Sequence, residues 1–185
     1  MEHRTADELT AALGEIRESP AVQGTVELIV RRPAEDEREV LDECTLDQEV
    51  GLVGDAWLAR GSSRMADGSA NPDAQLTLMN TRAAEAITGS RDRWPLAGDQ
   101  LYVDLDLSFE NLPAGTQLAV GEAVVEVTPE PHTGCAKFSA RFGTDALRFV
   151  NKSPGRELRL RGVNARIVTP GAVRTGDAIS KLLSS

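Results

Sequence analysis

The feature that most restricts the fold of this chain is a series of short segments in which apolar and polar residues alternate. Residues 24–32 and 100–107 show this alternation, and shorter runs occur at residues 75–79, 117–120 and 123–127. A period of two is expected for a strand that buries one face against a core. Repetition of such segments along the chain favours a sheet-rich protein over a helical bundle.

Glycines divide these segments at the places where strands are expected to turn. Gly121 separates two of the runs and predicts a tight hairpin. The alternation changes phase by one residue at Gly162, between residues 158–160 and residues 163–167. We interpret this change as a bulge or tight bend within one strand, as found where a strand turns a barrel corner.

The remaining strand signals complete a barrel. Residues 39–46 are expected to form one return strand, and residues 172–179 the closing strand pair. Many short strands, few helices and glycines at corners predict a mainly β protein. The expected fold is a closed β-barrel with a few peripheral helices rather than a doubly wound sheet.

Capping signals place the helices. Thr5 and Glu8 match a capping box, and the apolar spacing that follows predicts one amphipathic helix to about Ser19. Asn80 and Thr144 are each expected to cap a further helix.

At 185 residues, the chain is long enough for one domain with a sizeable core. We expect an N-terminal helix within residues 1–22 and a barrel domain over residues 23–185. Residues 1–20 are polar and no apolar run reaches membrane-spanning length, so we expect a cytoplasmic protein.

The composition excludes several classes of partner. The formal net charge is −9 and aromatic residues make up 4% of the chain. An acidic protein is repelled by duplex nucleic acid and by anionic membranes, and few aromatic rings are present to stack on unpaired bases. We therefore expect neither nucleic acid nor membrane as a partner.

The charge is unevenly distributed along the chain. Residues 35–49 are strongly acidic, whereas residues 132–174 carry a net positive charge. One interpretation is a local site for phosphate, carboxylate or another oxyanion. The alternative is that the basic residues only pair with the acidic segment on the surface.

The most informative stretch is the segment from Thr128 to Phe138, which contains Cys135. Two prolines stiffen the approach, Gly134 lets the backbone pass close to a neighbour, and helix-compatible residues follow the cysteine. The N-terminus of a helix, with Lys137 and Arg141 nearby, favours thiolate over thiol. A thiolate attacks electrophiles and binds soft metals.

Each of these residues also has a structural interpretation. A lone cysteine is often a small buried hydrophobic residue, although a loop of this composition is typical of one that presents a side chain to a ligand. His132 is either a proton donor and partner of the thiol or a residue that caps a turn. Cys44 lies among acidic residues, and we interpret it as structural.

Taken in order, these segments resemble the MOSC family, named for the C-terminal domain of molybdenum cofactor sulfurase. The resemblance rests on segments spread over most of the chain: Gly24 with the strand after it, residues 51–55 (Gly-Leu-Val-Gly-Asp), residues 75–79, Gly121 with the strand after it, the Cys135 loop, residues 160–163 and residues 176–177. Their order and spacing, rather than any one of them, make the match.

The resemblance implies a β-rich barrel with Cys135 as its chemical centre, either as a ligand of molybdenum in a pterin cofactor or as a sulfur carrier. Cys135 and His132 are then the candidate catalytic residues. The candidate cofactor-binding residues are Lys137, Arg141, Gly54, Asp55, Asp99, Gln100 and Arg161. Of these, Lys137 and Arg141 are the first candidates for contact with a pterin phosphate.

The chain departs from the family pattern at two places. Many relatives follow the Gly-Asp turn with histidine and basic residues, whereas residues 56–58 here are Ala-Trp-Leu. A Gly-Glu-Asn-Leu motif is represented only by residues 98–101, Gly-Asp-Gln-Leu. The phosphate contact that the family pattern implies directly after the Gly-Asp turn therefore lacks its usual residues.

Three functions follow from these features. The first is a molybdenum-cofactor-dependent oxidoreductase that acts on N-hydroxylated or related small molecules and takes electrons from a redox partner protein. The second is a sulfurtransferase that carries a persulfide on Cys135, supplied by a sulfur-donor protein. The third is a non-catalytic binding module. Serine hydrolases and P-loop proteins are excluded because the sequence lacks their motifs.

Overall fold

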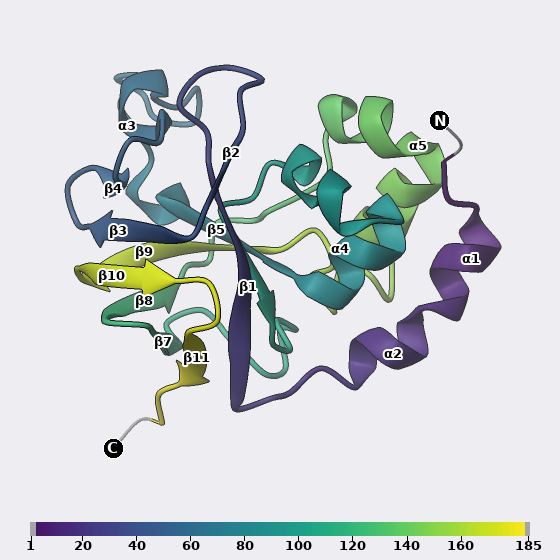
Figure 1. Ribbon diagram of the computed structural model, residues 1–185. Coiled ribbons are helices and arrows are strands. Elements are labelled where there is room, and N and C mark those ends of the chain that lie inside the picture. Colours follow the sequence, from purple (N-terminus) through teal and green to yellow (C-terminus); the bar gives the residue numbers. More distant parts are fainter. Residues whose placement is uncertain (1–2, 184–185) are drawn as a thin grey trace.

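Seven strands close into a barrel in the computed structural model, which describes residues 3–183 (Figure 1). Around the barrel, the strands follow the order β1, β11, β7, β8, β9, β5 and β6, and β6 returns to β1. Their bounds are β1 (Gln23–Arg31), β5 (Leu76–Asn80), β6 (Leu101–Asp104), β7 (Gln117–Val120), β8 (Ala123–Val127), β9 (Val163–Thr169) and β11 (Ala178–Lys181). The predicted closed β-barrel is confirmed.

A second, smaller sheet lies beside the barrel. It has the order β10 (Gly171–Arg174), β3 (Glu43–Asp47), β4 (Gly51–Leu52). The expected closing strand pair at residues 172–179 is wrong, because β10 pairs with β3 whereas β11 pairs with β1 and β7.

The predicted return strand at residues 39–46 is also divided. It is interrupted at Asp42 into β2 (Glu39–Leu41), which pairs with β1, and β3, which belongs to the second sheet. One continuous run of sequence therefore serves two sheets.

The longer helices cover one side of the barrel, to the right in Figure 1. They include α1 (Ala6–Ala11), α2 (Leu13–Arg17), α4 (Thr81–Thr88) and α5 (Ala136–Asn151). The other helical segments are α3 (Trp57–Arg60) and the 3₁₀ helices η1 (Pro72–Ala74) and η2 (Arg91–Ala97). The Thr5–Glu8 capping box and the Asn80 cap are confirmed. None of the described helices has the length and apolar character needed to cross a bilayer.

Two helix predictions need correction. The single helix expected up to Ser19 consists of α1 and α2, which meet at Ala12. The separate helix expected from Thr144 is the second half of α5, and the break before it is at Gly143, where φ is +91° and ψ is 167°.

The apolar residues form two cores. The first fills the barrel with side chains from its strands and from the small sheet. The second lies between the outer face of the barrel and helices α1, α2, α4 and α5. Cys44 belongs to the first core, where burial raises the pKa of its thiol to about 12 and Glu43 adds to the effect, so its structural interpretation is confirmed.

The interpretation of residues 158–167 as one bulged strand is wrong. Residues 152–162 form a series of turns, and β9 begins only at Val163. Leu160 fits the alternating pattern without being in a strand, because its apolar side chain is buried in the second core. Gly162 has φ of +111°, and a Cβ there would lie 2.4 Å from the carbonyl oxygen of Leu78, so this close approach to β5 requires glycine.

Candidate functional site

Cys135 occupies the position immediately before helix α5. Its backbone is extended, with φ −120° and ψ −178°, and its side chain makes no capping hydrogen bond. The residue is exposed. The predicted placement of this thiol at the start of a helix is confirmed, and the structural alternative of a buried cysteine does not hold.

The loop before Cys135 is fixed to the far end of the same helix. The side chain of Asn151 accepts a hydrogen bond from the backbone N–H of Gly134 (2.8 Å) and donates one to its carbonyl oxygen (3.0 Å). Gly134 packs closely on this helix: a Cβ there would lie 2.8 Å from Cδ1 of Leu147, so a larger residue would need that side chain to shift. The start of α5 is thus held against its own last turns.

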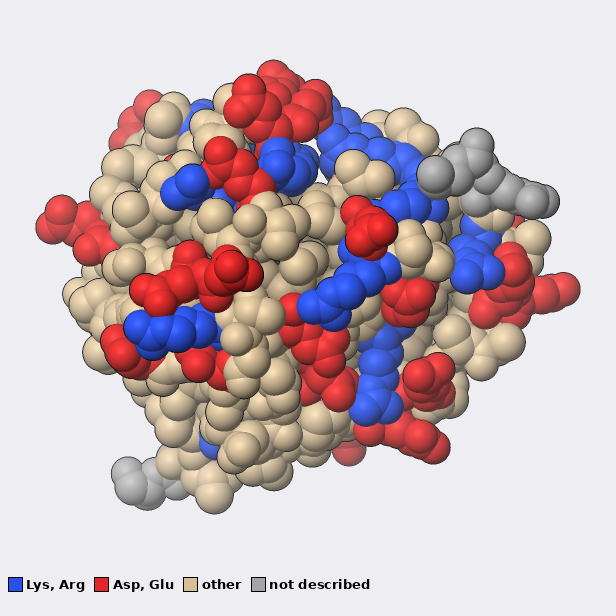
Figure 2. Space-filling model, viewed as in Figure 1, with Lys and Arg blue, Asp and Glu red and all other residues tan. Residues whose placement is uncertain are grey.

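A cleft lined by basic side chains opens beside the first turns of α5. Its volume is about 570 Å³, and five basic residues line it: Arg32, Arg38, Arg60, Lys137 and Arg141. We call it the cationic cleft. Figure 2 shows acidic side chains at the top of the molecule, above the loop between β1 and β2, with basic side chains beneath and beside them.

Arg32 is held in the cleft by a buried carboxylate. Its Nε and Nη2 donate to Oδ2 and Oδ1 of Asp55, each at 2.9 Å, and its Nη1 donates to the carbonyl oxygen of Gly98. Burial raises the pKa of Asp55, but its hydrogen bonds to Arg32 and the charge of that residue outweigh the effect and hold the pKa below its usual value. Gly54 forms the turn that leads into Asp55.

Arg38 and Arg60 are the basic residues of the cleft whose charge is least compensated. Neither pairs with a carboxylate in residues 3–183; Arg38 donates instead to the carbonyl oxygens of Pro95 and Glu37. Burial and the nearby cations Arg141 and Arg32 lower the pKa of Arg38. Desolvation and Arg32 lower the pKa of Arg60. Crowded cations without counterions favour binding of an anion.

The remaining two basic residues are paired with acidic residues at the rim of the cleft. Nζ of Lys137 lies 2.6 Å from Oε1 of Glu35, and Nη2 of Arg141 lies 2.8 Å from Oδ1 of Asp36. Both acids belong to the loop between β1 and β2 and are strongly exposed. Part of the basic segment therefore pairs with the acidic segment, and the same contacts close one side of the cationic cleft.

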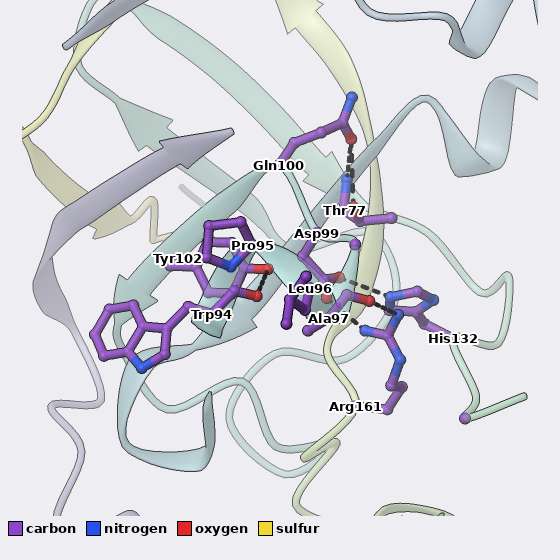
Figure 3. A network of polar contacts seen from close by, with 12 residues as sticks. Thr77, Trp94, Pro95, Leu96, Ala97, Asp99, Gln100, Tyr102, His132 and Arg161 are labelled. Atoms are coloured by element: carbon purple, nitrogen blue, oxygen red, sulfur yellow. Dashed lines mark hydrogen bonds and ion pairs between the residues drawn. The ribbon is translucent and has the colours of Figure 1, made fainter. Parts of the chain in front are cut away.

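Behind the cleft, Asp99 is fully buried between two partners (Figure 3). Its Oδ2 lies 2.5 Å from Nη1 of Arg161, and its Oδ1 lies 2.7 Å from Nε2 of His132. Burial raises the pKa of Asp99, but the charge of Arg161 and the hydrogen bonds from His132 and Arg161 outweigh it and hold the pKa low. Burial and Arg161 lower the pKa of His132 despite the opposing effect of Asp99. The neutral imidazole therefore donates Nε2–H to an ionised carboxylate.

Comparison with known proteins places this chain in a family. A family model described as MOSC domain matches residues 67–180, which is more than half of the chain. The chain belongs to the MOSC domain family. A comparison with curated proteins finds no matching sequence.

Solved structures agree with this assignment at the level of the fold. The YuaD protein from Bacillus subtilis superposes with a TM-score of 0.63 and 16% sequence identity, over 88% of this chain and 97% of that chain. YiiM from Escherichia coli superposes with a TM-score of 0.55 and 18% identity, over 87% of this chain and 71% of that chain. YiiM from Geobacillus stearothermophilus superposes with a TM-score of 0.52 and 12% identity, over 88% of this chain and 74% of that chain.

In this MOSC domain, the residues expected to bind a cofactor fall into two groups. Lys137 and Arg141 line the cationic cleft, and Asp55 lies behind it. Asp99 and Arg161 instead form the buried cluster with His132. Gln100 is also buried, where its Oε1 accepts from the backbone N–H of Thr77 and its Nε2 has no partner within residues 3–183.

The sequence analysis missed three residues of the cleft: Arg32, Arg38 and Arg60. Arg60 lies on α3, shortly after the Gly-Asp turn, and lines the cleft, whereas residues 56–58 contain no basic residue. Arg38 stands alone among acidic residues, which was a signal that it serves a separate purpose. No signal marked Arg32, because its role depends on the long-range contact with Asp55.

Proposed function

We propose that this MOSC domain binds a molybdenum-pterin cofactor, with the Cys135 thiolate as metal ligand and the cationic cleft as the anchor for the cofactor phosphate. The observation that carries the proposal is the position of Cys135. It is exposed directly before a helix whose first turns contribute Lys137 and Arg141 to a cleft with two further uncompensated guanidinium groups. Family membership supports the same ligand class.

The residues present suit such a group. A thiolate is a soft ligand, and planar guanidinium groups bind phosphate oxygens in pairs. Residues 3–183 contain no cluster of three or more His, Cys, Asp or Glu side chains able to hold a metal ion. A metal bound at Cys135 would therefore need most of its ligands from an organic carrier, and the cationic cleft offers that carrier an anionic anchor.

The proposed reaction is reduction of an N-hydroxylated or related small molecule, with electrons from a redox partner protein. When bound, the cofactor supplies the two-electron chemistry. The protein's own residues would bind and orient the cofactor. Arg38 and Arg60 would hold its phosphate, and the start of α5 presents Cys135. His132 is neutral near pH 7, and its Nδ1 is the atom able to accept a proton, since Nε2–H is directed to Asp99.

Metal content tests this proposal. Protein purified from a host that makes the cofactor should contain about one molybdenum per chain, and Cys135→Ser should lose most of it. Arg60→Gln should weaken retention of the pterin by about tenfold, because one charge-assisted contact contributes on the order of 1.5 kcal/mol. Arg148→Gln, an exposed change on α5 outside the cleft, serves as the control. Metal-free protein, or full metal content in Cys135→Ser, would contradict the proposal.

A persulfide on Cys135 is the second candidate, favoured by the exposure of its thiol. The Cys135 thiolate would attack the outer sulfur of a desulfurase persulfide, so that one S–S bond forms, another breaks and the donor leaves as a thiolate. Mass spectrometry after incubation with a cysteine desulfurase and cysteine should then show one added sulfur, removable by a thiol reductant. An unmodified Cys135 would exclude this function. Ligand binding that is unchanged in Cys135→Ser would instead indicate a non-catalytic binding module.

A further inference from the structure

A second cavity lies beneath the loop that leads to Cys135 and shares no residue with the cationic cleft. Its volume is about 260 Å³. Residues 128–133 form one wall and residues 159 and 161–164 another, and Phe109, Val150, Asn151 and Arg156 also line it. We call it the loop pocket. Thr133, which lines it, is two residues from Cys135, so the thiol lies in the chain between this pocket and the cleft residue Lys137.

Arg159 brings an uncompensated positive charge to the loop pocket. Its guanidinium carbon stacks 3.8 Å from the centre of the Phe109 ring, and its Nη1 donates to the carbonyl oxygen of Leu112 (2.6 Å). No carboxylate within residues 3–183 pairs with it. Burial lowers the pKa of Arg159, which shows that this cation has lost part of its hydration without gaining a counterion.

The other charges around the loop pocket add to this imbalance. Arg156 also lines it and has only a 3.5 Å contact with Glu157. The acidic residue of the lining, Glu130, is engaged with Arg64. The pocket therefore presents positive charge to whatever enters it.

Arg161 contributes a buried donor that has no partner. The residue is 8% exposed, and its Nη1 and Nη2 are engaged with Asp99 and the carbonyl oxygen of Ala97. Its Nε is buried and without a hydrogen-bond partner among the described residues. A buried donor without an acceptor destabilises the folded protein.

His132 contributes an acceptor on the opposite side of its ring. Its Nε2 faces Asp99, and its Cδ2 lies against Gly162, where an added Cβ would be 3.1 Å away. Nδ1 is therefore on the ring edge turned away from this contact, as Figure 3 shows, and no described residue bonds to it. As His132 is neutral, Nδ1 accepts a hydrogen bond.

We propose that the loop pocket binds a compact, flat carboxylate. Its volume of about 260 Å³ lies just below the range of roughly 300–1,000 Å³ that is usual for ligand pockets, which favours a compact ligand. Pro129, Pro131, Val150 and Val163 supply apolar surface for the body of the ligand, and the Arg159–Phe109 stack continues as a flat surface at the rim. Arg159 and Arg156 bind the carboxylate, and a ligand hydroxyl would donate to Nδ1 of His132.

In the proposed function, the loop pocket binds the substrate, and this assignment rests on the proposed function. Binding in the pocket does not require the metal. Protein without cofactor is therefore the appropriate material for a test, and failure of cofactor loading leaves the result intact.

Benzoate is a probe of matching size, with benzamide as its neutral isostere. Titration of the cofactor-free, full-length protein, followed by calorimetry and by NMR of the protein, should show saturable benzoate binding at least tenfold tighter than that of benzamide. 4-Hydroxybenzoate should bind severalfold tighter than benzoate, and this difference should vanish in His132→Phe. Arg159→Gln should weaken benzoate about tenfold, whereas Arg60→Gln in the cationic cleft should leave it unchanged.

Several results would overturn the proposal. These are absence of saturable benzoate binding, equal affinity for benzamide, or weakening by Arg60→Gln rather than Arg159→Gln, which would place the anion in the cationic cleft. Circular dichroism of each variant confirms folding before titration. Pyrophosphate tests the cationic cleft. Its binding should be weaker in Arg60→Gln and unchanged in Arg159→Gln.

Discussion

Asp99 has no contact with solvent, and its charge is balanced by a permanent cation on one side and an imidazole on the other. The ion pair with Arg161 persists at any pH where Asp99 is ionised. The contact with His132 forms in either protonation state of the ring, because Nε2 carries a hydrogen in the imidazolium and in this neutral tautomer. Because His132 and Asp99 titrate in different pH ranges, the cluster gives the stability of the protein two separate pH dependences.

The first of these concerns His132. Its folded-state pKa lies below the usual 6.5, so the unfolded chain takes up a proton first as the pH falls through that value. The free energy of unfolding should therefore be lower at about pH 5 than at about pH 7.5, and His132→Gln should remove this part of the decrease. Urea titrations across this range measure it. The chain has only two histidines, so NMR can follow His132 directly.

The second dependence belongs to Asp99 and lies at lower pH. Its folded-state pKa is below the usual 3.8, so its contribution to the free energy of unfolding is complete above that value and is lost as the pH falls through the folded-state pKa.

A His132 resonance that titrates at or above 6.5 would contradict the assignment of a neutral imidazole.

Gly162 predicts a stability effect that arises from backbone geometry alone. Gly162→Ala would combine φ of +111° with a contact of 2.4 Å to the Leu78 carbonyl oxygen, and the free energy of unfolding should fall by at least about 2 kcal/mol. Gly68→Ala is the matched control, because φ there is +75° and no atom lies within 4 Å of the added Cβ. It should cost only about 1 kcal/mol. Equal losses in urea unfolding would contradict this account.

At the scale of elements, the contact between the Gly134 loop and the last turn of α5 decides where Cys135 lies. Asn151→Ala removes both hydrogen bonds and should cost about 1–2 kcal/mol, since each such bond contributes on the order of 1 kcal/mol. Hydrogen exchange of the Gly134 amide should accelerate by about tenfold. Arg148→Ala, whose side chain is 70% exposed on the same helix, should leave this rate unchanged.

The loop between β1 and β2 predicts a change in anion binding. Glu35→Gln combined with Asp36→Asn would release Lys137 and Arg141, and pyrophosphate affinity should rise about tenfold at low salt. The gain should shrink as sodium chloride is added, because both pairs are exposed to solvent. Asn also tolerates the positive φ of 59° at position 36.

A matched control is Glu15→Gln with Glu18→Gln, which makes the same charge change at α2, on the opposite side of the molecule in Figure 1. Pyrophosphate titration by calorimetry compares the two double variants. An equal gain in both would mean that only net charge matters, and that the β1–β2 loop does not compete for the cleft.

Elements marked by local signals were predictable from sequence, and those defined by distant partners were not. Asn80, with alternation before it and a helix after it, predicted β5 and α4 correctly. Cys135 was placed correctly because prolines and a helix-compatible segment flank it. Arg32 and the buried position of Asp99 depend on contacts with residues far away in the chain, for which the sequence carries no local pattern.

The same reason limits the prediction of topology at the scale of the whole molecule. Alternation and turn glycines identified a closed barrel. They do not specify pairing, so residues 39–46 and 172–179 were each taken as one local unit although each run is shared between two sheets. When strands are paired by their proximity in sequence, the pairs that form only when the barrel closes are missed.

Closure itself predicts where the barrel is vulnerable. Ile179 on β11 is fully buried where that strand joins β1 to β7, and Ile179→Ala should lower the free energy of unfolding by about 2–5 kcal/mol. Leu183→Ala, four residues later and 79% exposed, should change it by less than about 0.5 kcal/mol. Urea unfolding of both variants measures the difference, and similar values would argue that the barrel does not depend on β11.

The contrast between the two cysteines has a practical consequence. The Cys44 sulfur is buried in the barrel and protonated at neutral pH, whereas Cys135 is exposed and lies in the chain between Thr133 of the loop pocket and Lys137 of the cationic cleft. The natural chain is therefore suited to attachment of a single dye or spin label without prior mutagenesis. Such a label at position 135 would report occupancy of the cationic cleft or of the loop pocket through changes in its emission or mobility.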